Sequence, residues 1–176
     1  MCKLLTQKEY NIREDELYVS LYYNFPLEDN EWKLADSLSP EKGLSINELM
    51  DEKSTFSMTL KSKSAFEFFN SKEQARKSER YIKDEEDRLD ENNELKGSIA
   101  CYKINIMETN KKLIQAVLSI TTYNKKFVNS DDKKKIDNVK FNMDEYILKP
   151  FIKRIKIELC LLYLSELYEK NIHTST

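Results

Sequence analysis

Glycine is nearly absent from this chain of 176 residues, which contains only Gly43 and Gly97. An average composition would place about 12 glycines in a chain of this length. Loops that cradle phosphate groups and turns that bind dinucleotides need several closely spaced glycines, because the backbone there must approach the ligand. The scarcity of glycine therefore excludes such sites, and it also excludes collagen-like folds and barrels with glycine at their corners.

The cysteines and the histidine argue against catalysis and metal binding. Cys2, Cys101 and Cys160 are far apart and include no CxxC pair, which disfavours a disulfide scaffold and a local zinc site. His173 lies in the C-terminal tail, whereas a catalytic histidine must be held rigidly within about 3 Å of its partners. We therefore predict no catalytic residue, no cofactor and no metal, and do not expect an enzyme.

Length and hydropathy predict a single domain over residues 1–176. Eight Phe and ten Tyr residues are too many for a disordered chain. The longest apolar run, Leu159–Leu164, has six residues, whereas a membrane span needs about 20. We expect a cytoplasmic protein without a membrane partner, located in the host cytoplasm if it is viral.

The first 70 residues predict a small mixed region of short helices and a few strands. Aromatic and β-branched residues favour a strand at about 17–25, although a helical stripe also fits there and the choice stays open. Residues 29–38 fit a short amphipathic helix. The capping box Ser45-Ile46-Asn47-Glu48 predicts another helix, and the alternation over residues 55–69 predicts a hairpin.

Residues 71–176 predict a bundle of three long helices. The first would run over the highly charged residues 71–94. The second, at 98–128, carries a coiled-coil-like heptad pattern. Ile99, Ile106, Leu113, Ile120 and Phe127 recur every seven residues, and Tyr102, Thr109, Ala116 and Tyr123 follow three later. The fold class we predict is therefore α+β and predominantly helical, with the mixed 1–70 region packed on the bundle.

The third predicted helix reaches from about Ser130 to Asn171, with a kink or break at Pro150. Two apolar stripes run along its second half, which predicts burial on two sides. The first stripe consists of Leu148, Ile152, Ile155, Leu159 and Leu162, and the second of Ile157, Leu161, Leu164, Tyr168 and Ile172.

The charges alternate in blocks although the net charge is only -2. Residues 14–52 are strongly acidic, while residues 103–156 carry thirteen basic against six acidic residues. The basic block could bind an anionic partner, or it could be the solvated face of lysine-rich helices, since it contains almost no arginine. Its candidate binding residues are Lys125, Lys126, Lys133, Lys134, Lys135, Lys153 and Arg154.

Aromatic residues near the N-terminus are the candidate contacts for another protein. Tyr and Trp are enriched at binding hot spots, and core packing is the competing interpretation. The candidates are Tyr22, Tyr23 and Trp32 with their acidic neighbours Glu28, Asp29 and Glu31.

These observations favour a non-catalytic protein–protein interaction module: an adaptor, inhibitor or regulatory subunit, or a phage or mobile-element protein that blocks a host factor. Another protein is the expected partner. The 98–128 heptad pattern could close the intramolecular bundle or form an oligomer, specifically a homodimer. A nucleic-acid-binding regulator that uses the basic 103–156 helices is the first alternative. A Mg-dependent nuclease, based on Glu31-Trp32-Lys33 or Asp51-Glu52-Lys53, is the second.

Overall fold

A five-stranded antiparallel sheet with the strand order β2-β1-β5-β4-β3 forms the centre of the protein. It is seen in a computed structural model that describes residues 16–28, 30–37 and 44–173. The strands are β1 (Leu17–Asn24), β2 (Lys33–Ser37), β3 (Phe66–Phe69), β4 (Ile99–Glu108) and β5 (Lys111–Thr122). The helices are α2 (Ile46–Leu49), α3 (Thr55–Lys61), α4 (Lys72–Lys77), α5 (Lys133–Asn142), the π-helical η2 (Met143–Leu148) and α6 (Lys149–His173).

The expected bundle of three long helices is wrong, because residues 98–128 form the β4–β5 hairpin instead of a coiled-coil-like helix. Both faces of this hairpin are covered, so its central positions are apolar on both sides of the sheet. Ile104 and Ala116 lie on one face, and Cys101 and Val117 on the other. An apolar residue every seventh position therefore arises here without a helix.

The β4–β5 turn consists of Thr109 and Asn110, which both have positive φ (45° and 69°). Two such residues in a row are typical of the tight turn that joins antiparallel strands. The expected homodimer required a helix at 98–128. These residues form a hairpin, so that helical surface does not exist.

Other local expectations had mixed outcomes. The strand expected at 17–25 is confirmed as β1, and the capping box of Ser45 and Glu48 opens α2. Residues 55–61 form α3 instead of a strand, and residues 33–37 form β2 instead of part of a helix. The helix expected over 71–94 is wrong beyond its first turns, because α4 ends at Lys77.

Gly97 marks a close approach between two segments of the chain. Its φ is +91°, and a Cβ atom there would lie 2.0 Å from the carbonyl oxygen of Thr122. Only glycine fits this contact, which joins the start of β4 to the end of β5.

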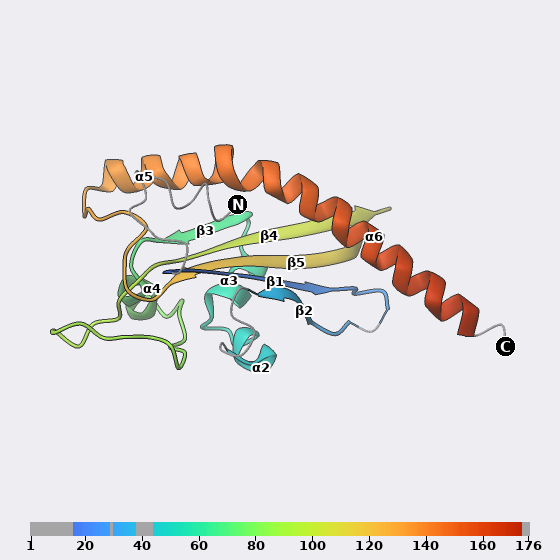
Figure 1. Cartoon of the computed structure of the whole chain (residues 1–176), viewed down its shortest axis with the longest axis horizontal. Coiled ribbons are helices and arrows are strands. Elements are labelled where there is room, and N and C mark those ends of the chain that lie inside the picture. Colours follow the sequence, from blue (N-terminus) through green and yellow to red (C-terminus); the bar gives the residue numbers. More distant parts are fainter. Residues whose placement is uncertain (1–15, 29, 38–43, 174–176) are drawn as a thin grey trace.

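One long helical rod covers one face of the sheet, in the order α5, η2, α6 (Figure 1). Asp132 caps its start, and the π-helical η2 ends at Leu148, two residues before Pro150, which lacks an amide hydrogen. The side chains of Leu148, Ile152 and Leu159 are buried against the sheet. On the opposite face lie α3, α4 and residues 78–97, with Phe56, Ala75 and Leu95 in a second core.

Candidate functional site

The side of α6 that points away from the sheet carries large apolar residues in solvent. Ile157, Leu161, Leu164, Tyr168 and Ile172 are 62, 58, 59, 69 and 47% exposed. We call these five residues the outer stripe. Residues of the opposite face of the same helix, such as Ile152 and Leu159, are 5 and 2% exposed. Both expected stripes are thus present on this helix. The first is packed on the sheet, whereas the second, which was also expected to be buried, is exposed to solvent.

Helical geometry explains why the sheet cannot cover the outer stripe. Each residue of an α-helix turns the chain by about 100°. The stripe residues follow one another at intervals of three or four positions, which keeps them within roughly 80° of one another around the helix axis. The same arithmetic places Leu159 on the opposite side, so a helix that packs Leu159 on the sheet must direct the outer stripe to solvent.

Several contacts fix α6 on the β1–β2 hairpin. Lys33 forms an ion pair of 3.2 Å with Glu166, and Lys170 one of 3.0 Å with Glu28. The ring of Tyr163 packs against Phe25, with 5.0 Å between the centroids. In Figure 1, the last turns of α6 extend past the ends of the strands. The outer stripe is therefore displayed on a well-anchored helix.

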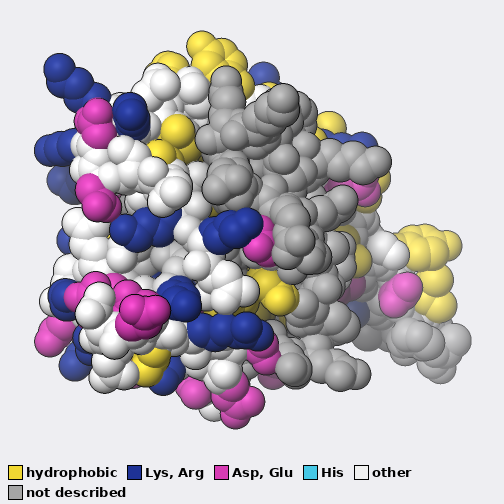
Figure 2. Space-filling model, turned by 60° about the vertical axis from the view of Figure 1, so that its left-hand side comes forward, with side chains coloured by type: hydrophobic (Ala, Val, Ile, Leu, Met, Phe, Trp, Pro, Cys, Tyr) yellow, Lys and Arg dark blue, Asp and Glu magenta, His cyan; other side chains and the backbone are white. Residues whose placement is uncertain are grey.

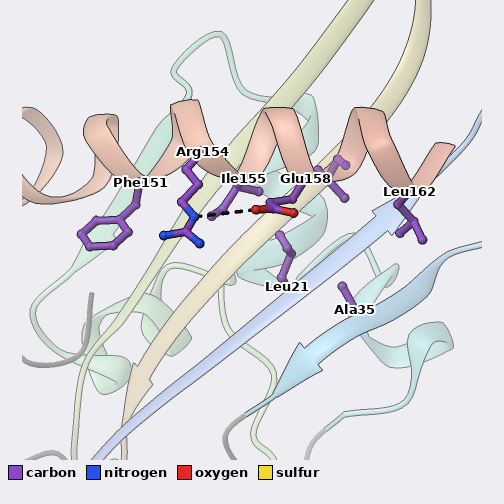
Figure 3. A pocket seen from close by; sticks show the side chains of 8 residues that line it. Leu21, Ala35, Phe151, Arg154, Ile155, Glu158 and Leu162 are labelled. Carbon is purple, nitrogen blue, oxygen red and sulfur yellow. Dashed lines mark ion pairs between the residues drawn. The ribbon is translucent and has the colours of Figure 1, made fainter. Parts of the chain in front are cut away.

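A groove of about 390 Å³ runs between α6 and the strands β1 and β2 (Figure 3). Leu21 and Ala35 line it from the strands, and Phe151, Ile155 and Leu162 from the helix. At its rim, Arg154 and Glu158 form an ion pair of 3.7 Å.

A second groove, of about 550 Å³, lies along the other flank of α6. Its walls include Ile157, Cys160 and Leu161 of α6 together with Ile106 and Met107 of β4. Because Met107 is itself 52% exposed, this groove extends the apolar surface of the outer stripe toward the end of β4. Contiguous exposed apolar surface of this kind is typical of protein interaction sites.

Of the aromatic residues expected to contact another protein, Tyr23 is buried, and Tyr22 and Trp32 are partly buried against the second core. Tyr23 is buried beside Phe25, while Tyr22 and Trp32 pack edge-on against Phe56, with centroid distances of 5.5 and 5.1 Å. Of their acidic neighbours, Glu28 is engaged by Lys170 and Glu31 is exposed, and Asp29 lies outside the described residues. The structure thus brings Tyr22 and Trp32 together on Phe56, while Tyr23, Glu28 and Glu31 have separate surroundings.

The basic residues expected to bind an anionic partner are also spread apart. Lys125 pairs with Glu16 and Lys126 with Asp131, each at 3.2 Å. Lys133, Lys134 and Lys135 begin α5, whereas Lys153 and Arg154 follow about 27 Å further along the helical rod. Figure 2 shows basic and acidic side chains interspersed over the face that it presents. The expected residues do not form one basic surface.

A buried polar cluster lies under residues 78–97, on the side of the sheet opposite α6. The Lys72 ammonium lies 2.6 Å from the Asp87 carboxylate and 3.6 Å above the ring centroid of Tyr123, and the side chains of Lys72 and Asp87 have no exposed surface. Tyr81 donates a hydrogen bond of 2.8 Å to Asp87, and Tyr123 donates one of 2.8 Å to Asp84.

Burial shifts the titration of this cluster. It lowers the pKa of Lys72 and raises the pKa of Tyr81, Tyr123 and Asp84, and the nearby charge of Asp87 raises that of Asp84 further. Because the central ion pair is closed to solvent, the cluster ties residues 78–97 to the sheet and offers no binding surface. The sequence does not predict this cluster, because Asp87 falls within the highly charged residues 71–94, for which a single helix is expected.

No protein-family model, no curated protein and no solved structure matches the chain. Within residues 16–28, 30–37 and 44–173, no three or more His, Cys, Asp or Glu side chains are grouped to hold a metal ion. No helix in the same part of the chain has the length and apolar character of a membrane span.

Proposed function

We propose that this chain is a non-catalytic protein-binding module, acting as an adaptor, inhibitor or regulatory subunit in the cytoplasm. We further propose that its contact surface is the outer stripe of α6. The observation that carries the proposal is the exposure of five large apolar side chains on a helix whose other face is packed. A solvent-exposed helix normally carries one apolar stripe, which faces the core, so a second stripe on the opposite side indicates another contact surface.

The shape of the surface favours an amphipathic helix as the partner. The outer stripe is narrow and straight, with apolar residues every three or four positions, which is the spacing by which two helices interlock their side chains. Helices that present apolar residues at this spacing are a common mode of peptide recognition.

The flanking charges define the partner further. The N-terminal turns of α6 carry Lys149, Lys153, Arg154 and Lys156 and no acidic residue, while Glu158, Glu166 and Glu169 follow with Lys170. The partner helix should therefore place acidic residues beside the start of α6 and basic residues beside its end.

Photo-crosslinking in the native host tests this proposal. A benzophenone amino acid replaces Tyr168 in the outer stripe, and a control chain carries it at Leu89, which is 41% exposed on the opposite layer. We expect covalent adducts with a polypeptide from position 168 and few from position 89. No adduct from position 168, or the same adducts from both positions, would contradict the proposed surface.

A further inference from the structure

We infer that the helix that covers the outer stripe is α6 of a second copy of this chain, which runs antiparallel to the first in a two-fold symmetric homodimer. This inference rests on the proposed function, because it takes the outer stripe as a contact surface and names the partner.

The outer stripe is complementary to itself in the antiparallel direction. A two-fold axis beside the midpoint between Leu161 and Leu164 places Leu161 against Leu164 of the second copy. The same register places Ile157 against Tyr168 of the second copy. Because a two-fold interface uses every contact twice, these four residues supply four apolar pairs from one stripe.

The charges of α6 favour the antiparallel over the parallel arrangement. The charged residues of its first turns are all basic, and acidic residues predominate among the charged residues after Ile157. Parallel helices would set like charges side by side, whereas antiparallel helices set the basic end of each against the acidic end of the other. The register above brings Arg154, whose side chain is 79% exposed, close to Glu169 of the second copy.

The exposed surface is large enough for a dimer of moderate affinity. Five side chains that are about half exposed or more supply roughly 500 Å² of apolar surface per copy. Two such surfaces with their flanking residues bury about 1,200 Å² in total, which is at the lower end for stable interfaces. We therefore expect a dissociation constant in roughly the micromolar range.

A lipid surface is the competing occupant, since an amphipathic helix can lie in a membrane interface. Such helices typically carry lysine and arginine along the whole polar face. The acidic residues Glu158, Glu166 and Glu169 in the second half of α6 disfavour binding to an anionic membrane and favour the second copy.

Sedimentation equilibrium of the purified full chain tests the dimer, over roughly 1 to 200 µM so that mass action can shift a micromolar equilibrium. We expect the mass to rise toward twice the 20.9 kDa of one chain. The double variant Leu161→Glu, Leu164→Glu should remain a monomer throughout, with an unchanged circular dichroism spectrum because both side chains are exposed. The control Leu89→Glu should dimerise like the wild type.

A charge swap tests the direction of the helices. Arg154→Glu alone and Glu169→Arg alone should each weaken the dimer about fivefold, and the two changes together in one chain should restore it. Loss without restoration would overturn the antiparallel register.

A wild-type chain that stays a monomer at the highest concentration would overturn the homodimer. Adducts from position 168 to a different protein would then leave the proposed function standing, and an absence of adducts would remove both. Binding of the monomeric wild type, but not of the double variant, to phosphatidylcholine–phosphatidylserine vesicles would overturn the homodimer in favour of a membrane surface.

Discussion

The two layers that cover the sheet are held in different ways. The layer of α3, α4 and residues 78–97 contains a buried ion pair, Lys72–Asp87, whose polar atoms are engaged inside the layer. The α6 layer is held mainly by apolar side chains such as Ile152 and Leu159, and it repeats an apolar face on its outer side. In the first layer the central charges are buried and paired, whereas in the second the outer stripe is left exposed to solvent.

The largest effect on stability should come from breaking the ion pair Lys72–Asp87 in the layer of α3, α4 and residues 78–97, which we call the polar layer. Lys72→Met removes the ammonium and leaves the Asp87 carboxylate buried without its counter-charge, which should lower the free energy of unfolding by about 3–5 kcal/mol in urea denaturation. The matched change Lys77→Met, at a side chain that is 60% exposed, should cost less than about 1 kcal/mol. Equal losses in the two variants would mean that the buried ion pair does not hold this layer.

In the α6 layer, the inner face should respond to the loss of apolar volume. Leu159→Ala leaves a cavity against the sheet and should lower the free energy of unfolding by about 3 kcal/mol, measured in urea at a dilution where the chain is monomeric. A loss below about 1 kcal/mol would show that α6 contributes little to the fold.

Acid should weaken the polar layer through Glu73. The hydrogen bond from the Arg76 guanidinium, followed by that from the Leu95 amide, lowers the pKa of Glu73 to about 2. An unfolded glutamate has a pKa near 4.3, so the unfolded chain takes up the proton first as the pH falls, and stability is lost from about pH 5 down to about pH 2.

The variant Glu73→Gln isolates this contribution. It should be less stable than the wild type at pH 7, and the difference between the two urea midpoints should shrink as the pH falls through the same range. A difference that stays constant with pH would rule out Glu73 as its source.

The smallest effect on folding should come from the outer stripe. Leu161→Ala exchanges one exposed side chain for another, so the monomer should lose less than about 0.5 kcal/mol of stability. Thermal unfolding of a dilute sample measures this value, to be compared with Leu159→Ala. A loss as large as that of the inner-face variant would show that Leu161 is packed within its own chain.

Local signals in the sequence anticipated part of this structure. Aromatic and β-branched residues indicated β1, and the capping box at Ser45 indicated the start of α2. The helical spacing of Leu159 and Leu161 located both faces of α6. What the spacing could not show is which face the sheet covers and which face remains exposed, because that depends on the tertiary arrangement.

The prediction of a helix at 98–128 was wrong for a physical reason, since these residues form the β4–β5 hairpin. When a strand is buried on both faces, the period of two disappears and a seven-residue repeat can match by chance. The sequence did not indicate the turn either, because Thr109 adopts a positive φ that is rare for threonine. The contact between Lys72 and Asp87 joins residues separated by a long charged segment, and no local pattern predicts it.

The most direct test of the account is a distance between two copies of α6. A spin label at Lys153 can be introduced as a single reactive cysteine after Cys2 and Cys160 are changed to serine, because Cys101 is buried and its pKa is raised to about 12. The antiparallel register separates positions 153 of the two copies by about 28 Å along the helices. We expect pulsed electron paramagnetic resonance to report about 30 Å, whereas a separation near 10 Å, as in parallel packing, or no dipolar coupling would contradict the account.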